Sequence, residues 1–403
     1  MSSAEDLGFN GERLERLDAL LHRYVDEGKL PGVQTVISRH GEIAHRDIYG
    51  FTDVEAGTKV EEDSIYRIFS MTKPITSVAL MMLFEEGHLL LENPVSRWIP
   101  AFADPKVWVG GSAAMPQTRP AEREISVHDV LTHMSGLTYG FQFQHPVDTM
   151  YREHQLGDFG AAPTYDLAEG IDRLAALPLL FDPGTSWNYS MSTDVCGRLV
   201  EAISGQTLDV FFKERIFEPL GMTDTGFSAP EADLDRCAPL YFRGNDGLVA
   251  MAPAKAMLTP STFLSGGSGL VGTTDDYVRF AQFLLNGGEL DGVRLLGDRT
   301  LAYMTTNHLP DGKRLNDMGQ STFSEIAMAG VGFGLGFSVI EDPAAVQNLC
   351  SKGEFGWGGA ASTAFMVDPA EDLTAVFMTQ LLPSTTYPLR RQLRNGMYQA
   401  LVG

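Results

Sequence analysis

The stretch that decides the fold is Phe69-Ser70-Met71-Thr72-Lys73-Pro74, and the apolar run of residues 78–83 follows it. Residues three apart share one face of a helix, so a helix beginning here places the Lys73 amine within reach of the Ser70 hydroxyl. Pro74 lacks an N–H group and is tolerated near a helix start, which favours this placement. A serine becomes a useful nucleophile beside a base or a desolvated lysine. Ser70 and Lys73 are therefore candidate catalytic residues, although Ser-x-x-Lys also occurs at ordinary helix starts.

Tyr189 lies in Trp-Asn-Tyr-Ser-Met at residues 187–191, after the turn signal Asp-Pro-Gly at residues 182–184. We expect it on a loop before a helix that begins near Asp194. A tyrosine hydroxyl beside an ammonium group can act as a general base. The alternative is a loop tyrosine that packs its ring and bonds a backbone group.

A glycine-rich segment, Phe-Gly-Trp-Gly-Gly-Ala-Ala at residues 355–361, leads into a predicted strand. Glycines beside a strand let a substrate or another backbone approach closely. An N–H group at such a strand edge could help to stabilise an oxyanion. The alternative is a bulge or a tight bend.

The composition limits the classes of partner. The chain has 403 residues, of which 44% are hydrophobic, and its formal net charge is -22. A surface with this much negative charge repels phosphate backbones and anionic lipids. We therefore expect neither nucleic-acid nor membrane partners. The three cysteines are far apart and predict neither a disulfide framework nor a metal site. The N-terminus lacks the features of a secretory signal, and no apolar run is long enough to cross a bilayer, so a cytoplasmic location is expected.

Both ends of the chain contain strand-forming runs, whereas the middle reads as helices broken by loops. This pattern predicts one antiparallel sheet made from the two ends, with a mostly helical region inserted between them. The expected division is a sheet domain of residues 1–84 and 236–403 and a helical domain of residues 85–235. Residues 101–122 are expected to be an exposed loop. Strands are predicted at 33–38, 43–49, 332–340, 361–367 and 373–379, and helices at 11–28, 275–285 and 386–401.

Taken together and in this order, the motifs Ser-x-x-Lys, Tyr-Ser-x and Trp-Gly-Gly resemble those of the serine β-lactamase and penicillin-binding-protein superfamily. The likeness is strongest to family VIII carboxylesterases, whose plan is similar to that of class C β-lactamases. Further matching pieces are residues 131–140 and 266–270, so the resemblance covers nearly the whole chain. It implies an α+β, β-lactamase-like fold, an antiparallel sheet flanked by helices with an inserted mostly helical domain.

The resemblance implies a role for each motif residue. Ser70 would be the acyl-accepting nucleophile, and Lys73 and Tyr189 would share the proton transfers. The backbone N–H groups of Ser70 and Ala360 would form an oxyanion hole. No cofactor and no metal are expected, and the oligomeric state stays open.

The resemblance also implies a substrate pocket at the third motif. Trp357 stands where lactamases carry the lysine of Lys-Thr-Gly and would line the pocket together with Gly358 and Gly359. Tyr139 and Phe141 are further candidates for the pocket lining. Ordinary packing in the core explains these two aromatic residues equally well.

Two departures from the lactamase pattern favour neutral ester substrates. Met191 replaces the asparagine of Tyr-x-Asn, and the lysine of the third motif is absent. Both missing groups help to hold a β-lactam. His133 resembles a triad base, but Lys73 and Tyr189 already supply that function, so a structural role is expected.

The sequence therefore predicts a cofactor-free serine esterase that acts on small, short-chain esters. Acyl transfer, and β-lactamase or D-aminopeptidase-type hydrolysis, stay open as alternatives within the enzymes. A non-catalytic binding protein on the same scaffold is a further alternative, which the intact Ser70, Lys73 and Tyr189 disfavour. No Gly-x-Ser-x-Gly motif occurs, which disfavours an α/β-hydrolase.

Overall fold

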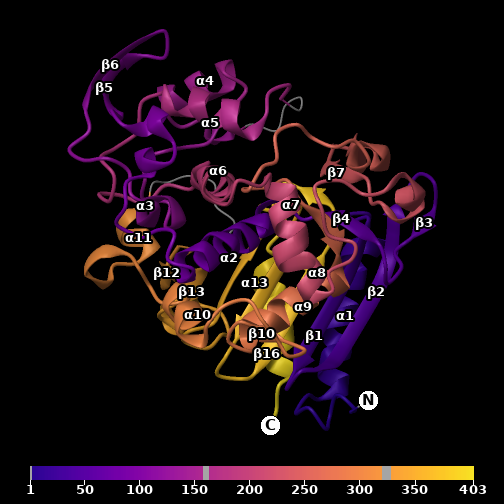
Figure 1. The fold of residues 1–403 in the computed structure, drawn as a ribbon. Helices are drawn as coiled ribbons and strands as arrows, with labels where there is room; N and C mark the ends of the chain where they lie inside the picture. The colour runs from indigo at the N-terminus through magenta and orange to yellow at the C-terminus, as the bar shows by residue number, and fades with distance from the viewer. Residues whose placement is uncertain (1, 158–162, 320–327) are drawn as a thin grey trace.

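The structure is a computed structural model, and it describes residues 2–157, 163–319 and 328–403 (Figure 1). Its centre is an eight-stranded antiparallel sheet with the strand order β12-β13-β14-β15-β16-β1-β2-β3. The N-terminal and C-terminal parts of the chain meet where β1 pairs with β16, with Val36 opposite Val376. The predicted sheet made from both chain ends is thus confirmed. Its strands are β1 (Gly32–Arg39), β2 (Glu42–Asp53), β3 (Thr58–Lys59), β12 (Val331–Phe333), β13 (Ser338–Ile340), β14 (Phe355–Gly358), β15 (Ala364–Asp368) and β16 (Leu373–Met378).

Helices cover both faces of this sheet, because the side chains of its central strands are apolar on both sides. Ala375 and Phe377 of β16 pack in one cluster with α1 (Gly11–Asp26) and α13 (Leu389–Ala400). Val376 and Met378 point to the opposite face, as alternation along a strand requires, and belong to the larger core. Helix α9 (Thr274–Leu285) contacts β16 there. The three helices predicted from periodicity are confirmed, with their ends shifted by a few residues.

The middle of the chain forms a mostly helical region beside α2 (Thr72–Glu85). Every residue of α2 from Thr72 to Leu83 is buried, so the helix is enclosed on all sides. It packs against α6. The helices of this region include α3 (Val127–Leu131), α4 (Pro146–Glu153), α5 (Leu167–Ala175), α6 (Ser192–Ser204) and α7 (Leu208–Phe212). The predicted boundaries of two domains stay a prediction.

Two local expectations were wrong. Residues 101–122, expected as a loop, contain the hairpin of β5 (Lys106–Ser112) and β6 (Met115–Pro120), which extends outward from the helical region in Figure 1. Its prolines are tolerated because a two-stranded hairpin has only edge strands. The single strand expected at 332–340 is a tight pair, β12 and β13. Gly336 has a φ of 93° in their turn, and a side chain there would collide with Ser77 of α2.

Across the described ranges, no helix combines the length and the apolar character needed to cross a membrane. The three cysteines are free thiols.

Candidate active site

The structure brings the three predicted catalytic side chains together. The Tyr189 hydroxyl donates a hydrogen bond of 2.6 Å to Ser70 Oγ. Lys73 Nζ donates to the same oxygen at 3.2 Å. Ser70 Oγ thus accepts from both groups, and either of them in its deprotonated form would be within reach of the Ser70 proton.

Ser70 is held by the helix that follows it. It lies in a short 3-10 turn, Phe69–Met71, that leads directly into α2. Phe69, immediately before it, has a φ of 43°, a left-handed conformation that costs a non-glycine residue roughly 1–3 kcal/mol. Phe69 packs against the cluster that contains Ala360 and Leu240. Tertiary packing thus offsets the strain beside the candidate nucleophile.

Lys73 is the second residue of α2, and its amine contacts oxygen atoms and aromatic rings. Besides Ser70, it donates to the carbonyl oxygen of Gly267 at 2.8 Å. Its Nζ lies 4.6 Å from the ring centroid of Tyr189 and 5.3 Å from that of Tyr139. Lys73 is only 2% exposed, so these contacts replace water around the amine.

The Gly267 carbonyl reaches Lys73 because its segment passes between α2 and α6. Thr76 of α2 donates a hydrogen bond of 2.7 Å to the carbonyl of Gly266. A side chain at Gly266 would lie 2.8 Å from the carbonyl oxygen of Thr193 in α6, so glycine is required there. This close packing explains the glycine pair that matched the family pattern but had no assigned role.

Tyr189 lies on the predicted loop before α6, and backbone hydrogen bonds join that loop to the segment after α3. The amide of Asn188 donates to the carbonyl of His133 at 3.0 Å, and the amide of Met191 donates to that of Thr138 at 3.1 Å. Four rings surround the Tyr189 ring, with centroids 5.2–6.4 Å away. Those rings belong to His133, Tyr139, Trp187 and Trp357.

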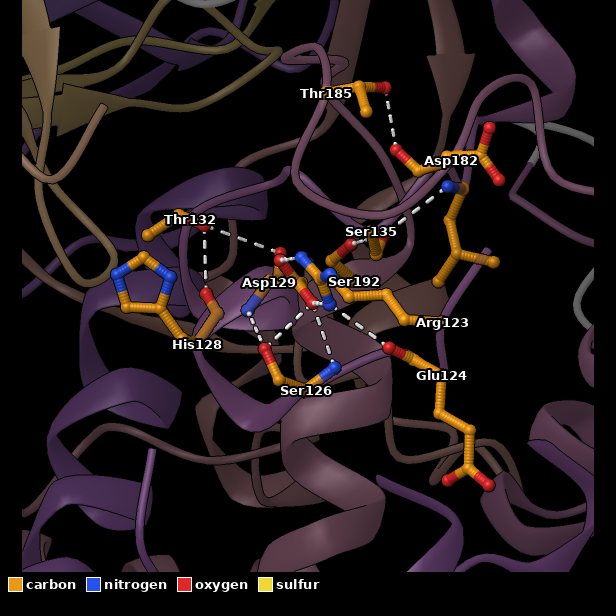
Figure 2. Close-up of polar contacts among 11 residues, drawn as sticks. Arg123, Glu124, Ser126, His128, Asp129, Thr132, Ser135, Asp182, Thr185 and Ser192 are labelled. Carbon is orange, nitrogen blue, oxygen red and sulfur yellow. Dashed lines mark hydrogen bonds and ion pairs between the residues drawn. The ribbon is translucent and has the colours of Figure 1, made fainter. Parts of the chain in front are cut away.

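Polar contacts hold the start of α3 and join the segment after it to α6 (Figure 2). Asp129 accepts hydrogen bonds of 2.8 and 2.7 Å from the amide and hydroxyl of Ser126 and pairs with Arg123 at 2.5 Å. Ser135, after the helix, bonds the hydroxyl of Ser192 at the start of α6, at 2.7 Å. The cap thus holds the start of α3, and the Ser135–Ser192 bond holds the segment that supports the Tyr189 loop.

His133 is buried behind Tyr189 and bonds Ser190, whose Oγ lies 3.2 Å from its Nδ1. Burial, and secondly the charge of Lys73, holds the pKa of His133 well below its usual range. The imidazole is therefore neutral near pH 7. This environment agrees with the structural role expected for His133.

Asp194 is a buried acid of this site that the sequence identified only as a helix start. It accepts hydrogen bonds from the Ser265 hydroxyl at 2.5 Å and from the Gly267 amide at 3.1 Å. Burial raises its pKa, whereas Ser265 and the charge of Lys73 act in the opposite direction. Asp194 therefore holds the Gly267 segment against Lys73. An acidic residue in the first turn of a helix is too common a pattern to have predicted this.

The third motif lies beside the residues that precede Ser70. Gly359 packs so closely on the carbonyl oxygen of Ile68 that a side chain there would collide with it. Ala360 is 3% exposed and shares a cluster with Phe69. Within the described parts of the chain, no hydrogen bond uses the Ala360 N–H group. The loop thus lies against the residues that precede Ser70, and the Ala360 N–H group stays a candidate oxyanion donor.

The predicted pocket residues lie around the same centre. The Trp357 ring packs 5.5 Å from that of Tyr189 and 5.4 Å from that of Phe333, and the indole is 3% exposed. Tyr139 stacks on Phe141 with 4.6 Å between the ring centroids. These contacts place the aromatic candidates at the site. In the three ranges that the structure describes, no cluster of acidic, histidine or cysteine side chains could hold a metal ion.

Comparisons with known proteins identify the family of the chain. The family model described as Beta-lactamase matches residues 17–395. Protein Rv1367c of Mycobacterium tuberculosis is 36% identical over 375 residues, which cover 92% of this chain and 90% of that protein. Esterase EstB of Burkholderia gladioli is 33% identical over 407 residues, covering 95% and 94%. The solved structure of "EstCE1, a hydrolase with promiscuous acyltransferase activity" superposes with a TM-score of 0.82 at 25% identity, covering 96% of this chain and 99% of that one.

Proposed function

The chain belongs to the beta-lactamase family, and on that premise we propose that it is a serine carboxylesterase that hydrolyses small, short-chain esters through an acyl-enzyme on Ser70. One observation carries the proposal. Ser70 Oγ lies within hydrogen-bond distance of both Lys73 Nζ and the Tyr189 hydroxyl. The esterase and hydrolase named among the similar proteins support the same reaction class.

In the acylation step, Ser70 Oγ attacks the ester carbonyl carbon, and its proton passes to the Lys73–Tyr189 pair. The N–H groups of Ser70 and Ala360 stabilise the negative oxygen of the tetrahedral intermediate. That intermediate collapses, and the bond to the alkoxide oxygen breaks. The pair returns the proton to the alkoxide, so a neutral alcohol leaves and the acyl group stays on Ser70.

Deacylation repeats these transfers with water as the nucleophile. The Lys73–Tyr189 pair accepts a proton from water as the water oxygen attacks the acyl carbon. The proton then returns to Ser70 Oγ as the acid leaves. No group outside the site is needed to balance either step.

The side chains around the trio favour neutral esters over β-lactams. Met191 and Trp357 occupy the positions where lactamases carry asparagine and lysine, so the usual amide and cationic contacts to a β-lactam are missing. The aromatic rings of Tyr139, Phe141 and Trp357 offer apolar contacts to an acyl or alcohol group. The net charge of -22 also disfavours anionic substrates.

A second candidate function is acyl transfer to an alcohol. The structural neighbour EstCE1 is described as a hydrolase with promiscuous acyltransferase activity, and its structure covers nearly the whole fold. Incubation with an acyl donor and excess alcohol separates the two reactions. Ester product in excess of free acid would favour transfer.

Labelling with a fluorophosphonate probe tests the proposed nucleophile. We expect one label per chain, located by mass spectrometry on Ser70, and parallel loss of ester turnover. The Ser70→Ala variant should neither label nor turn over esters, while Ser204→Ala, whose hydroxyl bonds the Val200 carbonyl in α6, serves as the control. Absence of labelling on the wild type would favour a binding protein, and full activity of Ser70→Ala would refute the mechanism.

A further inference from the structure

Arg390, in the first turn of α13, binds the loop that carries Ala360. Its Nη2 donates to the carbonyl oxygen of Gly359 at 2.6 Å and to that of Thr363 at 3.0 Å. Its Nε donates to Thr363 as well, at 3.2 Å. One guanidinium therefore joins the carbonyls on both sides of Ala360, and such charge-assisted bonds are stronger than neutral ones.

The sequence of the loop is fitted to this side chain. A Cβ at Gly358 would lie 2.5 Å from Arg390 Nη2 and 2.6 Å from Nε, so the guanidinium occupies the space of the missing side chain. On its other side, Gly359 packs on the Ile68 carbonyl. The loop is thus held between α13 and the residues before Ser70. Glycine at both positions permits this double approach.

The Gly359 carbonyl and the Ala360 N–H group belong to the same peptide unit. That peptide is trans, and the C=O and N–H bonds of a planar trans peptide point in opposite directions. Because Arg390 holds the Gly359 oxygen toward α13, it fixes the Ala360 N–H group facing away from α13. Its positive charge also polarises the peptide unit, which strengthens the N–H group as a donor.

We propose that Arg390 is a positioning residue for the oxyanion hole, because it fixes and polarises the peptide whose N–H group receives the developing negative charge. The inference rests on the proposed function. Arg390 reaches the reacting atoms only through the Gly359–Ala360 peptide. Without Arg390 the Gly359 carbonyl would keep, among the residues that the structure describes, only the 3.0 Å hydrogen bond from the Ser362 amide. The Gly359–Ala360 peptide would then be held less firmly, and its N–H group would be a weaker, less well aligned donor in the transition state.

The test compares Arg390→Met with Arg391→Met, a matched change on the neighbouring residue, which bonds the Gln347 carbonyl instead. Turnover of a p-nitrophenyl ester is normalised to active sites titrated with fluorophosphonate. Loss of one oxyanion donor typically lowers kcat about 10²–10³-fold, and we expect Arg390→Met to lose about tenfold to a hundredfold because the N–H group is misplaced rather than deleted. KM should change little, and Arg391→Met should match the wild type.

A boronic acid provides the second readout, because its adduct with Ser70 puts an oxygen in the oxyanion hole. Its affinity should fall by about the same factor as kcat in Arg390→Met and recover partly in Arg390→Lys. A purely structural role would instead lower the titrated active fraction and leave kcat per site unchanged, which would overturn the proposal. Should Arg390→Met fail to fold, Gly358→Ala displaces the guanidinium while keeping the arginine. An unchanged kcat in that variant would also overturn the proposal.

The wild type separates this proposal from the proposed function. Wild-type protein that neither labels at Ser70 nor turns over esters would refute both. An active wild type with an equally active Arg390→Met would refute only the role of Arg390.

Discussion

Replacing Tyr189 by phenylalanine removes one oxygen atom from the candidate active site and leaves the packing in place. The ring is fully buried, and the rings of His133, Trp187 and Trp357 that surround it remain. The change deletes the 2.6 Å hydrogen bond to Ser70 Oγ. Ser70 keeps its bond to Lys73, so the free energy of unfolding should change by no more than about 1.5 kcal/mol.

The effect on catalysis should be far larger. General acid–base catalysis contributes about 10²–10⁴-fold to a reaction rate. At about 1.4 kcal/mol for each tenfold change, this corresponds to roughly 3–5 kcal/mol in the activation barrier. The Tyr189→Phe variant should therefore lose at least a hundredfold in kcat/KM.

Steady-state hydrolysis of a short-chain p-nitrophenyl ester measures this loss, and urea unfolding measures the stability of the same preparation. Tyr151→Phe is the matched control, since Tyr151 is also fully buried but its hydroxyl accepts from the amide of Thr138. The control should stay within a few-fold of the wild type. A Tyr189→Phe enzyme that keeps more than a tenth of wild-type kcat/KM would show that the phenol is no part of the proton transfer.

The remaining predictions concern a base, a histidine and an ion pair. Lys73→Met should fold and lose at least a hundredfold in kcat/KM for the same ester, and near-normal turnover would remove the amine from the mechanism. His133 has a lowered pKa in the folded state, so the unfolded chain binds the extra proton below about pH 6.5. Stability should therefore be complete above that pH and fall as the pH decreases, by up to about 1.4 kcal/mol per pH unit from this residue. His133→Asn should flatten the dependence in urea unfolding and keep ester turnover; an unchanged slope would contradict this. Arg394→Met leaves Glu354, which is 1% exposed, without its cation, so the free energy of unfolding should fall by roughly 3 kcal/mol, and a loss below about 1 kcal/mol would argue against the ion pair.

Local geometry explains what the sequence predicted well. Ser70 and Lys73 are three residues apart in one helical segment, so their contact follows from helix periodicity alone. The sheet followed from strand-forming runs at both ends, and its β-lactamase-like fold is confirmed. Tyr189 lies 119 residues from Ser70 along the chain, and its position beside Ser70 was inferred from resemblance to a family. The esterase-type resemblance is supported by the 33% identity to EstB, while the individual catalytic roles stay predictions.

Contacts between distant segments explain what the sequence did not predict. The Gly267 carbonyl lies 194 residues from Lys73 along the chain. Every residue has a backbone carbonyl, so the sequence gives no sign of which one contacts Lys73. Asp194 and Arg390 act through backbone groups of other segments, so neither stands in a recognisable motif. The hairpin at residues 106–120 was missed because proline and glycine signals favour a loop and tolerate an exposed two-stranded ribbon equally.

Helix α2 is buried from Thr72 to Leu83, so the segment that carries or directly follows two of the three candidate catalytic groups is fixed by the core. Lys73 belongs to this helix and Ser70 to the turn directly before it, whereas the aromatic candidates come from the loop at Tyr139 and Phe141 and from Trp357 on β14, an interior strand of the sheet. Under the proposed function, substitutions at these aromatic positions should alter the preferred acyl or alcohol group, but they have to keep the Tyr189 ring in place because Tyr139 and Trp357 pack against it. A change of specificity on this scaffold is therefore constrained by the packing around one catalytic candidate, Tyr189, and much less by α2.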